Sequence, residues 1–260
     1  MVMPKALVFF DLDGTLLNNK SEVDQEVIAA LEKLKINGGV PFIATGRSPL
    51  EIQHVLDKTP IESFITLNGQ YIMYEGKEIY RSQMPKELLI RLKETADELK
   101  LAVSFYTSDK IRVTYTSKEV ENAYNFLHAK TPPVDAEIHL NDEVLMALIL
   151  TEDKSIDDQF REKFPELSFY RNTPYSIDVI TKGNSKATGI QELVKLMQFD
   201  KIPVYAFGDG PNDLEMVTHA DFGVAMENGT NILKNAADYI TSSHVEGGIV
   251  EGLEFYDLIK

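Results

Sequence analysis

The stretch Ala6-Leu7-Val8-Phe9-Phe10, which runs directly into Asp11-Leu12-Asp13-Gly14-Thr15, decides the fold. Five apolar residues in a row predict a short strand buried on both faces, as in a parallel sheet. In open α/β sheets the ligand crevice lies beyond the carboxyl ends of such strands. We therefore expect the loop after this strand, with its two aspartates, to lie where an α/β protein binds its ligand.

Both ends of the chain repeat this alternation of strand and helix. Ser48-Pro49-Leu50-Glu51 predicts a helix start, with a capping box and proline at the first helical position. We predict strands at 40–44, 64–67, 204–207 and 222–225, and helices at 24–37, 185–198, 213–219 and from 248 onward. This order indicates an α/β fold built on a Rossmann-like parallel sheet.

Between residues 81 and 183 the pattern changes. A predicted helix at 86–100 is followed by segments at 103–106, 111–115 and 177–180 in which apolar and polar residues alternate. Such alternation is typical of half-exposed antiparallel strands. We therefore expect an α+β insertion at 81–183, which interrupts a domain formed by 1–80 together with 184–260.

The composition excludes several classes of function. The 260 residues include 41 Asp and Glu against 26 Lys and Arg, whereas a nucleic-acid binder needs a basic surface to displace counterions. The lack of cysteine excludes disulfides, thiolate zinc sites and a catalytic thiol. The residues up to Pro4 carry no charged leader region, and the apolar run that ends at Phe10 is too short for a signal peptide or a spanning helix. We expect a cytoplasmic protein with no nucleic-acid or membrane partner.

A second acidic loop, Gly208-Asp209-Gly210-Pro211-Asn212-Asp213, also follows a predicted strand and opens a helix. Neighbouring carboxylates repel each other unless a cation or a shared proton holds them, and Mg²⁺ prefers oxygen ligands from a few protein groups. The alternative is a solvated turn for the first loop and a helix-capping turn for the second. A calcium loop is excluded for the first, because Leu16 stands where glycine is required. Two acidic loops after two strands favour a metal site assembled from both ends of the chain.

Two further groups are suited to phosphoryl transfer. Thr45-Gly46-Arg47 ends the second predicted strand, and Lys186 begins a helix. A hydroxyl and an ammonium can hold a transferring phosphoryl group. The alternatives are a strand-end hydroxyl bonded to the backbone for Thr45 and a solvated first-turn residue for Lys186. Arg47 either reaches the substrate or the insertion, or pairs with an acidic neighbour.

In this order the motifs resemble those of the haloacid dehalogenase-type (HAD) phosphohydrolases, and most closely the Cof-type sugar-phosphate phosphatases. The matching segments are Asp11-Leu12-Asp13-Gly14-Thr15, Thr45-Gly46-Arg47, Lys186, and Gly208-Asp209 with Asn212-Asp213. The resemblance implies a HAD core with the insertion as a C2-type (C2B) cap. The chain departs from the family pattern at Ala187, where glycine is usual, and at Gly229, where alanine is common.

The resemblance also implies a role for each residue. Asp11 is the expected nucleophile, which forms an aspartyl-phosphate, and Asp13 is the expected acid and base. The catalytic residues are expected to be Asp11, Asp13, Thr45 and Lys186. The groups expected to hold Mg²⁺ belong to Asp11, Asp13 (through its backbone carbonyl), Asp209 and Asp213. The groups expected to bind phosphate belong to Leu12, Thr45, Gly46, Lys186 and Asn212.

Two other functions share parts of this pattern. A capped phosphomutase has the same architecture but must protect its aspartyl-phosphate from water, and the sequence contains no device for that. A phospho-receiver module pairs an acidic pocket with a parallel sheet, but it lacks an Asp13 in an acid/base position and a large insertion. We therefore expect a phosphatase, a monomer or homodimer, that acts on a small phosphorylated metabolite such as a sugar phosphate.

Overall fold

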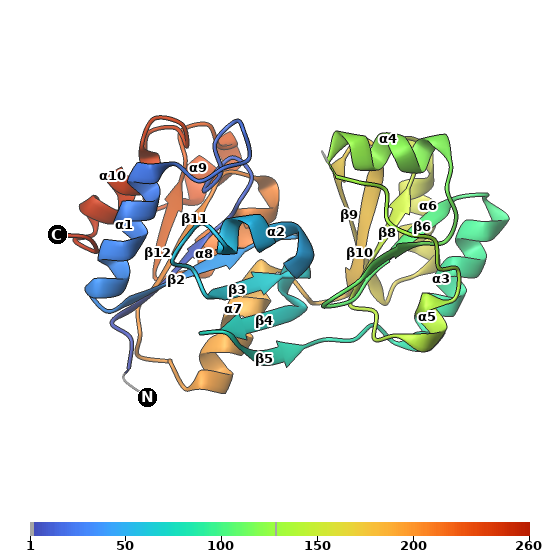
Figure 1. The fold of residues 1–260 in the computed structure, drawn as a ribbon, viewed down its shortest axis with the longest axis horizontal. Helices are drawn as coiled ribbons and strands as arrows, with labels where there is room; N and C mark the ends of the chain where they lie inside the picture. Colours follow the sequence, from blue (N-terminus) through green and yellow to red (C-terminus); the bar gives the residue numbers. More distant parts are fainter. Residues whose placement is uncertain (1–2, 128) are drawn as a thin grey trace. The chain divides into compact units, whose positions relative to one another are not determined.

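The chain is described in a computed structural model at residues 3–127 and 129–260, and it divides into two compact units (Figure 1). The first unit is Met1–Tyr80 together with Ser185–Lys260, and the second is Arg81–Asn184. The border expected from the sequence placed residue 184 in the first unit. Asn184 instead belongs to the second, where its backbone N–H donates to the carbonyl of Thr181.

An eight-stranded sheet, in the order β13-β12-β11-β1-β2-β3-β4-β5, forms the first unit. Its strands are β1 (Ala6–Phe10), β2 (Gly39–Ala44), β3 (Ser63–Thr66), β4 (Tyr71–Tyr74), β5 (Lys77–Arg81), β11 (Val204–Gly208), β12 (Phe222–Ala225) and β13 (Tyr239–Ile240). The pairs from β13 through β3 are parallel, and β4 joins β3 antiparallel. All five residues of β1 are buried, as its unbroken apolar run predicts, because β1 lies in the middle of the sheet.

Different helices cover the two faces of this sheet. The helices are α1 (Gln25–Ile36), α2 (Pro49–Leu56), α7 (Lys186–Met197), α8 (Leu214–His219), α9 (Asn231–Ala236) and α10 (Gly248–Phe255). Leu7 and Phe9 pack with α7 and α8 in one core cluster. Phe10 points to the other face and contacts the ring of Phe207. Helix α10 packs closely there, because a Cβ on its Gly252 would be 2.5 Å from the Phe207 ring. On that face α1 and α10 run side by side (Figure 1).

The parallel register brings three loops to one edge of the sheet. Phe10 pairs with Phe207 of β11 on one side and with Ile43 of β2 on the other. The N–H of Asp11 then donates to the carbonyl of Phe207 at 3.0 Å, so the loop after β1 begins at the same level as the loop after β11. The loops after β1, β2 and β11, which carry the predicted site residues, therefore leave the sheet together.

The second unit is a five-stranded antiparallel sheet in the order β7-β6-β8-β10-β9. Its strands are β6 (Ala102–Tyr106), β7 (Ile111–Val113), β8 (Met146–Leu150), β9 (Leu167–Thr173) and β10 (Ser176–Thr181). Its helices are α3 (Lys86–Glu98), α4 (Lys118–Phe126), α5 (Ile138–Asn141) and α6 (Asp157–Lys163).

Strand β6 is not half-exposed, as the alternating pattern predicts, but buried along its whole length. Val103 and Phe105 pack in one core cluster with α3 and α6. On the opposite face the Tyr124 hydroxyl of α4 donates to Ser104 at 2.7 Å and lies 3.2 Å from the Tyr106 hydroxyl. The polar positions of the strand are therefore covered by a helix that supplies its own hydroxyl group. The predicted strand at 111–115 is also too long, because β7 ends at Val113.

No helix in the described part of the chain combines the length and the apolar composition that crossing a membrane requires.

Candidate active site

Three carboxylates from the ends of the parallel strands meet at the edge of the first unit's sheet. One oxygen each of Asp11, Asp209 and Asp213 lies within 4.8 Å of the other two. Asp11 follows β1, whereas Asp209 and Asp213 belong to the loop after β11. Asp11 and Asp213 are buried and Asp209 is half-buried, so water screens this negative charge poorly.

Lys186 lies among these carboxylates. It is the first residue of α7, whose start is fixed by Ser185, which accepts a hydrogen bond from the N–H of Thr188. The side chain is 1% exposed, and its Nζ donates to Asp11 and, at 2.7 Å, to Oδ1 of Asp213. The solvated alternative for Lys186 is therefore wrong.

The electrostatics of this cluster leave a deficit of positive charge. Burial, reinforced by Asp213, raises the pKa of Asp11 to about 8 and that of Asp209 to about 6. Burial alone would lower the pKa of Lys186, but the adjacent Asp11 and Asp213 outweigh it and hold that pKa above its ordinary value. When all four groups are ionised, three carboxylates against one ammonium leave two negative charges in excess. An all-oxygen donor set with this excess fits a divalent cation.

Asp213 also organises the loop that carries it. Its Oδ2 accepts the N–H groups of Asp209 at 3.0 Å and Gly210 at 2.9 Å, while Oδ1 accepts from Lys186. Both of its oxygens thus have protein donors. Thr15, to which sequence reasoning gave no role, donates to Oδ1 of Asp209 at 3.2 Å.

Gly14 is needed for the close approach of the two acidic loops. It has φ +80°, and a Cβ there would collide with the carboxylate of Asp209. Asn228, a second residue without a predicted role, donates from Nδ2 to the carbonyl of Gly14 at 2.8 Å and accepts the N–H of His244 at 2.9 Å. The first loop is therefore held from both sides.

The side chain of Asp13 lies outside this carboxylate cluster. It is 60% exposed, and Arg47 binds it with two hydrogen bonds, Nε to Oδ2 at 2.9 Å and Nη2 to Oδ1 at 2.5 Å. Of the alternatives for Arg47, the pairing with an acidic neighbour is the one present in the structure.

The remaining predicted residues differ in their placement. Thr45 is buried, and its hydroxyl accepts the N–H of Arg47 at 3.2 Å, which leaves the hydroxyl proton free to point elsewhere. Gly46 lies against Asn68, because a Cβ on this glycine would be 3.1 Å from Oδ1 of Asn68. Leu12 is buried in the β1 loop, whereas Asn212 is exposed on the short 3-10 turn Pro211–Asp213.

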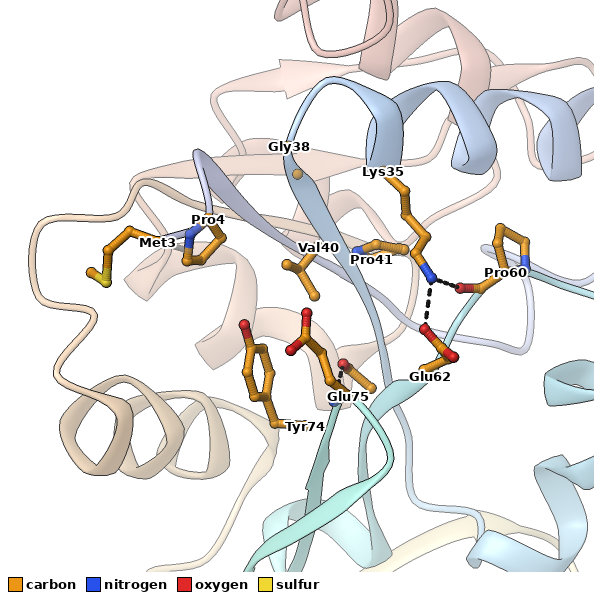
Figure 2. Close-up of a pocket in the computed structure, with 12 residues that line it drawn as sticks. Met3, Pro4, Lys35, Gly38, Val40, Pro41, Pro60, Glu62, Tyr74 and Glu75 are labelled. Atoms are coloured by element: carbon orange, nitrogen blue, oxygen red, sulfur yellow. Dashed lines mark hydrogen bonds and ion pairs between the residues drawn. The ribbon is translucent and has the colours of Figure 1, made fainter. Parts of the chain in front are cut away.

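A separate cavity of about 200 Å³ lies at the opposite end of the parallel strands, where Gly39 and Ser63 begin β2 and β3 (Figure 2). The ammonium of Lys35 donates to Glu62 and to the carbonyl of Pro60, each at 2.8 Å, and Figure 2 marks both contacts. This ammonium is thus already paired, and this cavity is distinct from the acidic cluster.

The fold and the acidic cluster define a haloacid dehalogenase-like hydrolase. The model of that family matches residues 8–253, and the chain belongs to it. More closely, it is a HAD-type phosphatase of the Cof type, subclass IIB, whose separate antiparallel cap sheet corresponds to the second unit.

Individual relatives match nearly the whole chain. "Putative phosphatase YkrA" of Bacillus subtilis (strain 168) is 33% identical over 99% of this chain and 100% of its own length. The 5-amino-6-(5-phospho-D-ribitylamino)uracil phosphatase YitU of the same organism is 26% identical over 96% of this chain and 97% of its own. The structure of the HAD subclass IIB sugar phosphatase BT4131 superposes with a TM-score of 0.85 at 30% identity, and covers 98% of this chain and 100% of that one. The protein is thus a phosphatase of this family.

Proposed function

We propose that the protein is a Mg²⁺-dependent phosphatase that works through an aspartyl-phosphate formed on Asp11. The observation that supports this proposal is the buried cluster in which Asp11, at the end of β1, contacts Lys186 beside two further carboxylates. A buried carboxylate held by an ammonium is a fixed nucleophile, because its rotation is restricted before the substrate arrives.

In the first step an oxygen of Asp11 attacks phosphorus, and the bond from phosphorus to the substrate oxygen breaks. Asp13 gives its proton to that departing oxygen. Asp13 then takes a proton from water, which attacks the aspartyl-phosphate and releases inorganic phosphate and free Asp11.

The phosphoryl oxygens need donors during both steps. Thr45, Lys186 and the backbone amides of Leu12 and Gly46 serve this role, together with Asn212. Lys186 has a second task, since its bonds to Asp11 and Asp213 join the nucleophile to the loop after β11.

The residues that would hold Mg²⁺ are Asp11 and Asp209 through their carboxylates and Asp13 through its backbone carbonyl. Asp213 would complete the site by orienting the Asp209 loop and coordinated water. When bound, Mg²⁺ supplies the positive charge that the cluster lacks and that a phosphate dianion requires.

The relatives suggest which substrates to test. BT4131 is a sugar phosphatase, and YitU is a phosphatase of a phosphoribitylamino-uracil. We propose a substrate of this kind, a phosphate monoester of a sugar or a sugar alcohol chain, bound by a monomer or homodimer.

Phosphate release provides the test. We expect turnover of p-nitrophenyl phosphate, and faster turnover of one member of a panel of sugar phosphates and ribityl phosphates, with Mg²⁺ present and none after EDTA treatment. Asp11→Asn should abolish it, whereas Asp158→Asn, which alters an exposed carboxylate of the second unit, should not. Retained turnover in Asp11→Asn would contradict the proposal, and isomer formation from a hexose 1-phosphate with a bisphosphate activator would indicate a mutase.

A further inference from the structure

We infer that Arg47 is a positioning residue that fixes the carboxyl group of Asp13 for proton transfer to the leaving group. The inference rests on the proposed function, in which Asp13 is the acid and base, and it gives Arg47 a role in that chemistry. Its basis is the double hydrogen bond that joins the two side chains.

Asp13 needs an external constraint. Its side chain is 60% exposed, and the bonds to Arg47 are its only side-chain hydrogen bonds among the described residues. A carboxylate held at one oxygen can still rotate about the bond to its Cβ. A planar guanidinium that binds both oxygens removes this freedom and sets the plane of the carboxyl group.

Arg47 is itself anchored on both sides of its backbone. Its N–H donates to the hydroxyl of Thr45 at 3.2 Å, and its carbonyl accepts the N–H of Leu67 at 3.1 Å. The next residue, Ser48, closes the start of α2 by donating to Glu51 from both its N–H and its hydroxyl, at 2.8 and 2.7 Å. The guanidinium therefore extends from a fixed segment of the β2 loop to the neighbouring β1 loop.

Two simpler explanations make different predictions. An ordinary surface ion pair, like Lys58 with Glu22, is exposed on both sides and makes a single contact, and its loss has little effect on catalysis. Direct binding of the substrate phosphate by Arg47 would make its removal slow all phosphate esters equally. If Arg47 positions Asp13, its removal should lower kcat/KM more for a leaving group that needs a proton than for one that does not.

Two substrates of nearly the same shape separate these cases. Phenol, like the tyrosine side chain, has a pKa of about 10 and departs poorly without a proton, whereas p-nitrophenol is a much stronger acid and departs readily. We would compare kcat/KM for phenyl phosphate and p-nitrophenyl phosphate, because this ratio reports the step in which the leaving group departs. The variants are Arg47→Ala and Arg47→Lys, which keeps the charge but loses the fork, with Lys58→Ala as the matched control.

We expect both Arg47 variants to lose about 30-fold on phenyl phosphate and about threefold on p-nitrophenyl phosphate, a fraction of the roughly 10²- to 10⁴-fold that a positioned acid contributes, because Asp13 itself is still present. Asp13→Asn should likewise lose more kcat/KM on phenyl phosphate than on p-nitrophenyl phosphate. Lys58→Ala should leave the comparison between the two substrates unchanged. Equal losses on both substrates, or no loss in Arg47→Ala, would overturn the inference. If the inference about Arg47 fails in this way but Asp11→Asn is inactive in the same experiment, the proposed function still stands. If the wild-type protein releases no phosphate from either ester, the proposed function and the inference both fail.

Discussion

The two units bury charge in opposite ways. In the second unit Arg171 forms a nearly buried pair with Asp157, to which Nε and Nη2 donate at 2.9 and 2.6 Å. Its remaining N–H groups donate to the carbonyls of Thr151, Asp153 and Pro174, so this charge is balanced. In the first unit Lys186 is the one cation, among the residues that the structure describes, beside the cluster of three carboxylates.

The difference shows that burial of charge does not by itself mark a functional site. A balanced and fully hydrogen-bonded pair joins local segments, here α6, which carries Asp157, to β9, which carries Arg171. An unbalanced cluster is unfavourable until an outside charge completes it. The imbalance therefore distinguishes the site from the structural pair.

The largest effect should follow from Lys186→Met. The substitution removes the sole cation of the cluster, and we expect kcat to fall about 10³-fold, as for the loss of a central phosphoryl-stabilising donor. The metal-free variant should also unfold at a lower temperature, because three carboxylates remain without a cation. Phosphate release and thermal unfolding with and without Mg²⁺ measure both. A kcat within tenfold of the wild-type value would contradict the assigned role.

Arg171→Met should affect stability alone. Leaving Asp157 buried without a partner costs about 3–5 kcal/mol, which lowers Tm by several degrees in a protein of this size. The kcat per folded molecule should not change. Arg161→Met removes an exposed ion pair of the same unit and is the control, with an expected loss below about 1 kcal/mol. A fall in kcat for Arg171→Met would show that the balanced pair also serves the reaction.

Mg²⁺ should stabilise the protein more at pH 8 than at pH 5.5. The folded-state pKa values of Asp11 and Asp209, about 8 and about 6, lie above the ordinary value of 3.8, so the folded chain holds protons that the unfolded chain has lost. Without metal these groups therefore make stability fall as pH rises from about 4 to about 8. Mg²⁺ can bind only when Asp11 and Asp209 give up these protons. It therefore binds more tightly at the higher pH, at which more of these carboxyl groups are ionised. Thermal unfolding at both pH values tests this, and an equal Mg²⁺ effect at both would contradict it.

The smallest effect should come from Tyr124→Phe. The change removes a hydroxyl that donates to Ser104 and lies beside Tyr106 in the second unit. We expect a loss of about 1 kcal/mol in the free energy of unfolding and an unchanged kcat. Chemical denaturation measures the first and phosphate release the second. Tyr115→Phe, which removes a bond at an exposed position, is the control.

Much of the first unit could be predicted because its information is local. The apolar run of β1 and the acidic residues that follow it are contiguous, and the parallel register then brings Asp11 and Asp209 together. The placement of Lys186 needed the family resemblance, since one lysine at a helix start has no local signal for burial.

What could not be predicted depends on distant contacts. Asn228 supports Gly14 across 214 positions, and no local spacing reveals such a pair. The burial of β6 depends on Tyr124, which lies on a helix that the alternation of the strand does not encode. Strand β8 is different, because its apolar run Met146–Leu150 is a local signal that sequence reasoning did not use.

The place of β1 in the sheet has a consequence for synthesis on the ribosome. Its neighbour β11 is made only after the whole second unit, and Lys186 follows Asp11 by 175 positions. Until then the emerging chain has Leu7, Val8 and Phe9 on an unpaired sheet edge, an open template for association with other chains. The order of segments that assembles the site thus leaves this edge of β1 without its partner strand until β11 has been made.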